Sequence, residues 1–555
     1  MVRKDDFDTV VMRNSNRLTS PRKKVALIHP PAVSKRYLRT KFMPYGMAVI
    51  YAFLKEHHVP VVQYDFLMDY LFNSPHDINF HSHDNTFSQE EFFSHLNGGK
   101  AHSGLEAFTT KYGQRLPPDA CLYGFSIVAY HQFWASLLLA KYVRKMNPQA
   151  VIVFGGPFIT IRPLESLVPF GQADYWIKGS GELPLLHLYR LLSGETNLSV
   201  EEIPGIIFKK GDLIHQSPKS TLSAEEERAP DFEGLALREY QYDHPVTGTS
   251  TLFIPYRLSK GCPSRCNFCT GRLVDTYGCK SPSKIASELA YLSEKYHSSN
   301  FQFADASING NPKQLSEVCR TLRDSLPNIR WYAYAKVAGF DKRLLLQCKE
   351  AGCISLFWGI ESASQTTIDL LGKGFLVEKM YELLDYSISI GITNFVHLIY
   401  NTPHESTKDI EALEALISKY VACPKVVFLP QRFILEPQSR LFEQPDSFGL
   451  RNLTPVTTSL FEREEYAYSE VEGLDAAEVL ARNRQHSARL SRSLELIRVM
   501  EWKRSADGFL PRIFPSRFLL RLVRYSQNGK VANKFLHNIT RRFVERTNQP
   551  LREQL

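Results

Sequence analysis

Short apolar runs alternate with amphipathic stretches through the first 195 residues. The apolar runs have the length of buried strands and lie at 25–29, 59–64, 122–128, 150–154 and 175–178. Apolar side chains recur at helical spacing in residues 46–57, 131–146 and 182–192. Strands that alternate with helices predict an α/β domain over residues 23–195, with a doubly wound, Rossmann-like parallel sheet. Residues 72–118 are polar and predict an insertion with some helix.

A second alternating series occupies residues 250–440. Its candidate strands lie at 252–258, 300–304, 330–335, 354–359, 394–400 and 426–430, with amphipathic stretches such as 282–296 and 312–326 between them. A complete β/α barrel uses eight strands, so six strands in this order predict a partial (β/α)6 barrel.

The remaining segments break this rhythm. Residues 1–22 are polar and predict a disordered tail, and residues 196–249 predict a linker with a hairpin around Lys210-Gly211-Asp212. Residues 441–555 predict a mostly helical, basic C-terminal domain, with many arginines at 482, 484, 489, 492, 504, 512, 517, 521, 524, 541 and 542. A basic helical face can meet nucleic acid, an acidic peptide or a membrane surface. A solvated helical face is the favoured interpretation here.

Composition adds bounds to this picture. A chain of 555 residues is too long for one ordinary core, so we expect two large domains and a further piece. No stretch approaches the ~20 apolar residues of a membrane span, and the polar start of the chain does not resemble a signal peptide. The nine cysteines form one cluster plus single residues, which is typical of a reducing compartment. These features predict a cytoplasmic protein.

The ends of the predicted strands are the expected ligand sites. Open parallel sheets bind ligands outside the carboxyl ends of their strands. In the first series this rim holds Asp65, Ser126, Gly155, Gly156 and the turn 179–182. In the second series a cysteine-rich loop follows the first strand, at the rim where barrel active sites form.

That loop, residues 261–269, has the sequence GCPSRCNFC, with cysteines spaced Cys-x3-Cys-x2-Cys. Three thiolates on one loop can hold three irons of a cubane cluster and leave the fourth iron open for chemistry. A structural zinc site needs four protein ligands and would recruit Cys279. The second, distant cysteine pair that is usual in zinc sites is absent, so a cluster on Cys262, Cys266 and Cys269 is the favoured reading.

The cysteine spacing, with Phe268 before the last cysteine, resembles the signature of the radical S-adenosylmethionine (SAM) superfamily. Later marks follow in order. Residues 359–362 (GIES) resemble its ribose-contacting motif, and residues 371–374 (LGKG) resemble the Lys-Gly turn that comes after it. Residues 401–406 (NTPHES) resemble its Gly-x-Pro-x-Glu-Thr turn, with Asn401 where glycine is common and Ser406 where threonine is common.

The resemblance implies a [4Fe-4S] cluster that cleaves SAM to a 5′-deoxyadenosyl radical, and an electron donor such as flavodoxin or ferredoxin. It implies SAM contacts from Phe268, Gly359, Glu361 and Ser362. Lys336, at the end of the third strand, is a further candidate for the substrate or for the SAM carboxylate. Each has a structural alternative: Phe268 as a core aromatic, Ser362 as a helix cap, and Lys336 as an exposed strand-end lysine.

The first series resembles the cobalamin-binding domain that precedes the barrel in many radical SAM enzymes. This resemblance implies cobalamin contacts from Asp65, Ser126, Gly155, Gly156, Gly179 and Glu182. The Asp-x-His-x-x-Gly motif that supplies a histidine to cobalt is absent, so no histidine ligand from that motif is expected. A degenerate domain that only packs on the barrel is the alternative. Residues 433–450 resemble a stretch in enzymes of this type that modify peptides. A surface strand followed by a turn is the alternative interpretation of the same residues, so no substrate is assigned from them.

The leading hypothesis is a cobalamin-dependent radical SAM methyltransferase acting on an unactivated carbon of a peptide or small natural product. A second hypothesis keeps both cofactors for cyclisation or oxidation without methyl transfer, as in the anaerobic porphyrin-ring cyclases. A methylthiotransferase would need a further cysteine triad in the first domain, where only Cys121 lies. A non-enzymatic protein that merely binds a cluster or zinc is the remaining alternative. A nucleic-acid partner is not expected.

Overall fold

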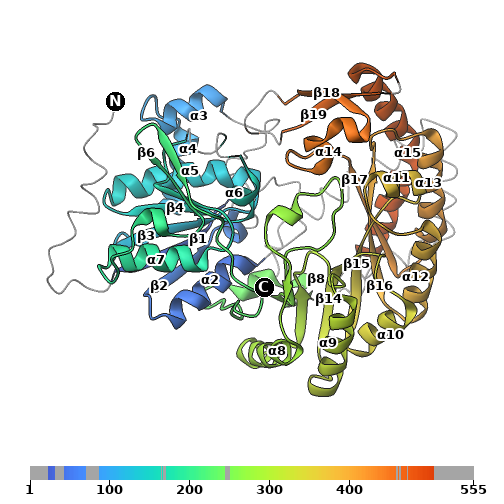
Figure 1. Cartoon of the computed structure of the whole chain (residues 1–555), viewed down its shortest axis with the longest axis horizontal. Coiled ribbons are helices and arrows are strands. Elements are labelled where there is room, and N and C mark those ends of the chain that lie inside the picture. Colours follow the sequence, from blue (N-terminus) through green and yellow to red (C-terminus); the bar gives the residue numbers. More distant parts are fainter. Residues whose placement is uncertain are drawn as a thin grey trace, which may run out of the picture.

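The computed structural model describes residues 23–505 except 32–42, 71–86, 164–165, 167–169, 244–249, 458–460, 462–463 and 472. The predicted disordered tail, 1–22, and the last fifty residues of the predicted helical domain lie outside the described residues. The structure contains two large parallel sheets, each with its own helices, which lie beside each other (Figure 1). The predicted α/β class with parallel sheets is confirmed.

The first sheet has the order β2-β1-β3-β4-β5-β6-β7. Its parallel strands are β1 (Lys24–His29), β2 (Val61–Asp65), β3 (Ala120–Ser126), β4 (Val151–Gly155) and β5 (Tyr175–Ile177). The order 2-1-3-4-5 reverses direction between β1 and β3, and such a switch point opens a crevice at the carboxyl ends of the strands. The hairpin predicted for the linker adds β6 (Ile206–Lys210) and β7 (Leu213–Gln216) to this same sheet as antiparallel strands.

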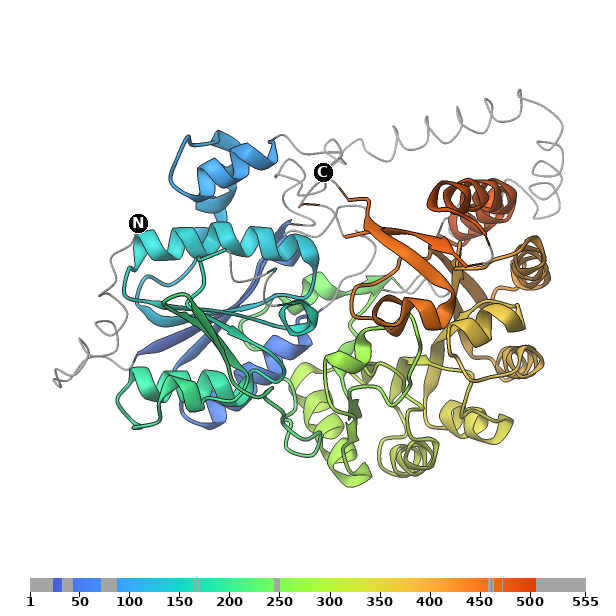
Figure 2. The same cartoon turned by 45° about the horizontal axis from the view of Figure 1, so that its top comes forward.

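Helices cover both faces of the first sheet. One face carries α2 (Tyr45–Glu56) and α7 (Glu182–Leu192); the other carries α3 (Gln89–Leu96), α4 (Ser103–Gly113), α5 (Tyr130–Met146) and α6 (Pro157–Ile161) (Figures 1 and 2). The alternation of β1 shows why: Val25 and Leu27 enter one apolar core, and Ala26 and Ile28 enter the other. Successive side chains of a strand point to opposite faces, so a continuous apolar run serves two cores.

The second sheet has six parallel strands in sequence order. They are β10 (Ile254–Tyr256), β13 (Asn300–Phe303), β14 (Arg330–Ala335), β15 (Cys353–Glu361), β16 (Thr393–Tyr400) and β17 (Val426–Arg432). The helices between and after them are α8 (Pro282–Tyr296), α9 (Pro312–Ser325), α10 (Lys342–Glu350), α11 (Gln365–Leu370), α12 (Val377–Ser389) and α13 (Thr407–Tyr420), and they lie along the outer side of the sheet (Figure 1). Ser281 and Asn311 cap α8 and α9, and each is followed by a proline, the residue preferred at the first helical position.

Of the first predicted strand of this sheet, 252–258, the structure has only Ile254–Tyr256 as a strand, β10. The short strand β9 (Ser250–Thr251) lies before the predicted range and pairs with β8 (Tyr242–Asp243). The next residues, β11 (Ser259–Lys260), leave the parallel sheet and pair antiparallel with β12 (Gly278–Cys279). The buried Asp305 carboxylate accepts the backbone N–H groups of Leu258 and Ser259 at 3.1 and 2.6 Å, so these donors are satisfied where the ladder ends.

The described part of the region after residue 440 contains a strand hairpin that the sequence prediction did not include, as well as helices. It begins with α14 (Arg440–Glu443) and continues into an antiparallel hairpin of β18 (Leu450–Pro455) and β19 (Tyr466–Glu470) before α15 (Ala476–Ser505). In β19 the buried side chains Tyr468 and Glu470 alternate with more exposed ones, a period of two that is typical of a strand. The hairpin covers an apolar cluster that includes Leu371, Phe433 and Leu435.

Part of the basic C-terminal face is paired within the protein. Arg482 donates to both carboxylate oxygens of Glu470, at 2.6 and 2.8 Å. Arg489 pairs with Glu411 and Glu414 on α13. Arg482 therefore attaches α15 to the β18–β19 hairpin, and Arg489 attaches it to the barrel-like domain. Among the described residues no helix is both long enough and apolar enough to cross a membrane.

Candidate functional site

The cysteine loop leaves the rim of the second sheet between β11 and β12. Gly261 begins it with φ = +65°, and a Cβ there would lie 2.6 Å from the carbonyl oxygen of Asp275, so only glycine fits. Cys262 and Cys266 are half-buried and Cys269 is exposed. No group of three or more His, Cys, Asp or Glu side chains in the described part of the chain has the arrangement of a single-metal site.

Asn267, between the second and third cysteines, anchors the loop to its surroundings. Its backbone N–H donates to the Leu371 carbonyl at 2.9 Å, and its side-chain amide donates to the Leu370 carbonyl at 2.8 Å. Arg440 donates to its amide oxygen at 3.1 Å, and its own carbonyl accepts the N–H of Leu441 at 3.0 Å. The C-terminal end of α11 and helix α14 therefore hold the loop from two sides. Sequence reasoning did not select Asn267.

Lys373 lies at the centre of the site and was not among the predicted contacts. Its Nζ lies 3.0 Å from Oε1 of Glu361 and 5.7 Å from the centre of the Phe268 ring. Both charged side chains are more than nine-tenths buried. Burial alone would lower the pKa of Lys373, but Glu361 and Cys266 outweigh it, so the pKa is raised and the ammonium form is favoured. The signal for Lys373 was present in the LGKG turn.

The same lysine acts on the cysteine thiols. Burial raises the pKa of Cys266, and the positive charge of Lys373 offsets part of that rise. The pKa of Cys269 is also raised by desolvation and is partly lowered by the N–H of Gly271, which donates to its sulfur at 3.3 Å. Thiolates are the metal-binding form of cysteine. The net shift still favours the neutral thiols, so the buried cation and the backbone donor only reduce the cost of forming the thiolates that bind iron.

The structure places the other predicted SAM residues in different surroundings. At Gly359 a Cβ would lie 2.9 Å from Oε1 of Glu361, so the missing side chain leaves room for the Glu361–Lys373 pair. Lys336 reaches the cysteine loop, where its Nζ donates to the Ser264 hydroxyl at 2.8 Å. The Ser362 hydroxyl accepts the N–H of Ser364 at 3.2 Å, and Ser364, not Ser362, is the N-cap residue of α11.

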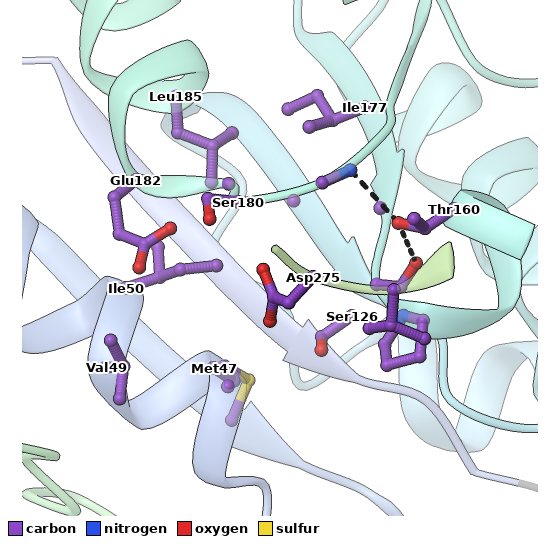
Figure 3. Close-up of a pocket in the computed structure, with 18 of the residues that line it drawn as sticks. Met47, Val49, Ile50, Ser126, Thr160, Ile177, Ser180, Glu182, Leu185 and Asp275 are labelled. Atoms are coloured by element: carbon purple, nitrogen blue, oxygen red, sulfur yellow. Dashed lines mark hydrogen bonds between the residues drawn. The ribbon is translucent and has the colours of Figure 1, made fainter. Parts of the chain in front are cut away.

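A second cluster of predicted residues lines a cavity at the switch point of the first sheet, which we call the rim pocket (Figure 3). It has an open volume of about 140 Å³. Five of the six predicted cobalamin residues line it: Ser126, Gly155, Gly156, Gly179 and Glu182. Apolar side chains of β1, α2 and α7 form much of its remaining wall, among them Leu27, Met47, Ile50 and Leu185.

Glycines shape the wall of the rim pocket. Gly156 has φ = +102°, and a Cβ there would lie 2.5 Å from the Ile127 carbonyl oxygen. Gly179 has φ = +92°, and its N–H donates to the Thr160 hydroxyl at 3.1 Å, one of the bonds drawn in Figure 3. At Gly46, on the first turn of α2, a Cβ would meet no atom within 4 Å. The first two glycines are required by the backbone, whereas Gly46 leaves open space.

Residues that flank the cysteine loop also line the rim pocket. Val274 and Asp275, which follow the cysteine loop, and Lys260, which precedes it, line the same cavity. Lys260 donates to the Ser180 hydroxyl at 2.9 Å, so the two sheets meet at this wall. Sequence reasoning missed these residues because the contact joins segments about eighty residues apart in the chain.

Glu227 organises the charges behind this wall. Its side chain is fully buried and pairs with Arg257, with Lys280 at 3.7 Å and with Lys260 at 3.8 Å. The Tyr45 hydroxyl donates to it at 2.7 Å. Burial alone would raise the pKa of Glu227, but Arg257 and Lys280 outweigh it and lower the pKa to about 2.

Asp65, the sixth predicted cobalamin residue, does not line the rim pocket. It pairs with His29 at 3.1 Å and accepts the Leu67 N–H at 2.8 Å. It lines a different cavity, with Arg115 and Tyr240. The reason is the strand order: β2 stands at the edge of the sheet beside β1, while the switch-point crevice opens toward β3, β4 and β5.

Comparison with known proteins agrees with the geometry of the cysteine loop. Residues 256–417 match the Radical SAM superfamily. The chain contains a radical SAM domain. Proteins of this superfamily bind a [4Fe-4S] cluster and SAM, so the predicted enzyme class and these two predicted cofactors are confirmed at the level of the superfamily.

Curated relatives divide between two reactions. The chain is 25% identical over 280 residues to an uncharacterised methyltransferase of Pyrococcus horikoshii, covering 49% of this chain and 59% of that protein. It is 23% identical over 278 residues to the anaerobic magnesium-protoporphyrin IX monomethyl ester cyclase of Cereibacter sphaeroides, covering 49% of this chain and 45% of that protein. The chain thus spans about half of the length of these relatives.

Two solved structures share the fold over most of the chain. The radical SAM methyltransferase TsrM from Kitasatospora setae, with cobalamin and a [4Fe-4S] cluster bound, superposes with a TM-score of 0.59 at 16% identity, covering 79% of this chain and 81% of that one. The cobalamin-dependent radical SAM enzyme OxsB, with aqua-cobalamin and SAM bound, gives 0.54 at 15% identity, covering 80% and 61%. At these identities the likeness is one of fold.

Proposed function

We propose that the protein is a cobalamin-dependent radical SAM enzyme that transfers a methyl group to an unactivated carbon. The observation that carries this proposal is the rim pocket, where predicted cobalamin residues meet the segments that flank the cysteine loop. A pocket shared by the two domains would hold a corrinoid beside the cluster. The relatives named as methyltransferases favour methyl transfer.

The cysteine loop has the donor set for an open cluster. Cys262, Cys266 and Cys269 would hold three irons, which leaves one iron for the amino and carboxylate groups of SAM. When bound, the cluster and SAM supply a carbon radical that abstracts hydrogen, and cobalamin supplies the methyl group. Every other task falls to the protein, which binds and orients these groups and excludes water.

The buried pair at the end of β15 would orient SAM. A carboxylate accepts hydroxyl hydrogen bonds, so Glu361 is the candidate for the two ribose hydroxyls, and Lys373 fixes its orientation. Glu361 has φ = +68°, a strained conformation for a residue with a side chain. This strain turns the carboxylate toward Lys373 beside the cysteine loop.

The rim pocket would hold the nucleotide tail of a corrinoid. Its volume suits a flat heterocycle rather than a whole corrin, and its wall combines apolar side chains with the hydroxyls of Ser126, Thr160 and Ser180. At Gly46, which also lines the pocket, a Cβ would meet no atom within 4 Å, so the missing side chain leaves room for a ligand. Asp65 lies outside this proposal.

Corrinoid binding is the first test. After reconstitution with hydroxocobalamin and gel filtration, the corrinoid absorbance that stays with the protein is measured. Gly46→Phe fills the open space of the rim pocket without meeting protein atoms at Cβ, so bound corrinoid should fall at least tenfold. Gly171→Phe is the matched control, because Gly171 is exposed, lies outside the pocket and also has free space at Cβ. Equal corrinoid retention by both variants would contradict the cobalamin site.

Product mass separates methyl transfer from the cyclase alternative. Anaerobic turnover with SAM carrying a deuterated methyl group should give a product heavier by one labelled methyl group. A product that lacks the label, formed together with 5′-deoxyadenosine, would reject methyl transfer and favour cyclisation or oxidation. The proposal also includes a peptide or small natural product as substrate, a flavodoxin or ferredoxin as electron donor, and the cytoplasm as location.

A further inference from the structure

An open hollow on the protein surface lies beside the cysteine loop. It has a volume of about 470 Å³ and is lined by Arg265, Arg272, Arg440, Glu443 and Gln444, and we call it the arginine surface. None of these five residues lines the rim pocket. The proposed function therefore gives this surface no role.

Two of the three arginines belong to the segment that carries the cysteines. Arg265 directly precedes Cys266, and Arg272 follows Cys269 by three residues. Cys269 is exposed, and the N–H of Gly271 donates to its sulfur at 3.3 Å, which keeps the segment that leads to Arg272 against this cysteine. The chain thus brings arginines to the exterior beside a thiol that would hold iron.

The arginine surface carries a net positive charge. Arg265 is exposed and forms no hydrogen bond or ion pair with the described residues. Arg440 donates to the neutral amide of Asn267 at 3.1 Å, so its charge is not cancelled. Arg272 pairs with Glu443 at 3.2 Å, so three cations and one carboxylate leave two positive charges in excess. Residues 261–274 contain no Asp or Glu that would reduce this excess.

The position and the charge of this surface match the needs of electron delivery. Reductive cleavage of SAM consumes one electron, which has to reach the cluster from outside the chain. Encounters between redox proteins are transient and small, with less than about 1,200 Å² of buried surface. Complementary charge brings such partners together quickly and in the correct orientation. A net-positive surface beside an exposed cluster ligand provides both nearness to the cluster and attraction for an acidic partner.

We propose that the arginine surface is the docking site of an acidic protein that carries single electrons. Carboxylates around the redox group of the carrier pair with Arg265 and Arg440. The carrier gives up one electron to the oxidised cluster, and in this step no bond forms or breaks and no proton moves. The proposal rests on the radical SAM part of the proposed function and is independent of cobalamin and of methyl transfer.

Binding is measured first, because it does not depend on turnover. Oxidised flavodoxin and oxidised ferredoxin, both acidic, are titrated separately into the reconstituted full-length protein by isothermal titration calorimetry. At least one of them should bind, and its affinity should fall as salt is added, because salt screens exposed charges. At low ionic strength Arg265→Glu should weaken this binding about tenfold, since a like charge then faces the carboxylates of the carrier.

Arg320→Glu is the matched control for this charge reversal. Arg320 is exposed on α9, lies outside the arginine surface and forms no hydrogen bond or ion pair within the described part of the chain. A solvated arginine that plays no part in docking should behave in this way, so carrier binding by Arg320→Glu should equal that of the wild type.

Two further variants test the charge itself. Arg265→Lys keeps the positive charge and should retain most of the binding. Glu443→Gln removes the carboxylate that lines the arginine surface, so it should tighten binding of the carrier about threefold at low ionic strength. The Glu443 side chain is 47% exposed, and its replacement leaves no buried charge without a partner.

Formation of 5′-deoxyadenosine separates docking from chemistry. When the reduced carrier is the electron source, Arg265→Glu should lower the rate about tenfold at low ionic strength. When dithionite, a small reductant that needs no docking site, is the electron source, the variant and the wild type should have equal rates. Equal loss with both reductants would show that Arg265 supports the cysteine loop itself, which would overturn the proposal.

Binding of neither carrier by the wild type, or the same binding by Arg265→Glu and Arg320→Glu, would also overturn the proposal. A wild type that fails to cleave SAM with dithionite would instead contradict the proposed function. The two failures are therefore distinguishable, because the first concerns the carrier and the second concerns the cluster.

Discussion

Replacing Glu227 by glutamine should destabilise the wall between the two domains. Glu227 is buried against Arg257, Lys260 and Lys280, and the Tyr45 hydroxyl also donates to it. Glutamine keeps the size of the side chain but removes its charge. Three cations would then share a buried site without their common counter-ion, and breaking a buried pair in this way typically costs about 3–5 kcal/mol.

The pKa of Glu227 gives an independent magnitude. The carboxyl group has a pKa of about 2 in the folded protein, against 4.5 in its ordinary state. A difference of about 2.5 units corresponds to about 3.4 kcal/mol of stability, at 1.36 kcal/mol per unit. Because the folded pKa is depressed, this contribution is fully present above about pH 5 and is lost as the pH falls toward 2.

The assay is urea unfolding followed by fluorescence and circular dichroism, at pH 7 and at pH 4. At pH 7 the Glu227→Gln variant should lose about 3–5 kcal/mol of unfolding free energy. At pH 4 the difference in unfolding free energy between the wild type and this variant should be about 0.8 kcal/mol smaller than at pH 7. At this pH part of the stability that the Glu227 charge contributes has already been lost. Glu239→Gln is the matched control, since Glu239 is exposed and should change stability by less than about 0.5 kcal/mol.

Two results would refute this reasoning. If Glu227→Gln unfolds with the same free energy as Glu239→Gln, the cluster does not hold the domains together. If the wild type and Glu227→Gln differ in unfolding free energy by the same amount at pH 4 and at pH 7, the charge of the Glu227 carboxylate is not the source of that difference.

Three further predictions concern the cysteine loop. Cys266→Ala should abolish reductive SAM cleavage and lower the iron bound after anaerobic reconstitution, which is expected at roughly four irons per wild-type chain; cleavage that persists would contradict the cluster. Lys373→Gln should weaken SAM binding about tenfold, or roughly 1.4 kcal/mol, by equilibrium dialysis, because Glu361 loses the cation that orients it. Lys379→Gln, at a half-buried lysine that pairs with Glu382 on α12, serves as the control. Gly372→Ala should lower iron retention more than Gly374→Ala does. Both glycines have positive φ, but only at Gly372 would a Cβ meet Asn267, at 3.0 Å. Equal loss of iron in both variants would show that backbone strain, and not the contact with Asn267, accounts for the loss.

Periodicity was sufficient to predict most elements of the fold. The predicted strand 330–335 and helix 182–192 match β14 and α7 residue for residue, because both carry a regular apolar pattern that packs on a core. Sequence reasoning failed where tertiary pairing overrides the local pattern. Residues 259–260, which follow the predicted strand 252–258, pair antiparallel with residues 278–279, and the β18–β19 hairpin lies in a region predicted to be mostly helical.

The candidate sites divide in the same way. Local spacing was enough for the cysteine loop, since Cys262, Cys266 and Cys269 lie within eight residues and any fold that closes this loop brings them together. The partners of the loop could not be read from the chain. Asn267 gains its role from residues about one hundred positions later, and Lys373 gains its role from the buried carboxylate of Glu361.

Residue types and short spacings therefore predict the chemistry proposed for this protein: thiols for an iron–sulfur cluster and glycine turns at strand ends for a bound ligand. Strand order decides which of these residues share a site. It brings Ser126, Gly155 and Glu182 into one cavity and leaves Asp65 at the sheet edge. The charged wall around Glu227 also depends on tertiary structure, because Tyr45, Glu227 and Arg257 lie far apart in the chain and meet only when both domains are folded.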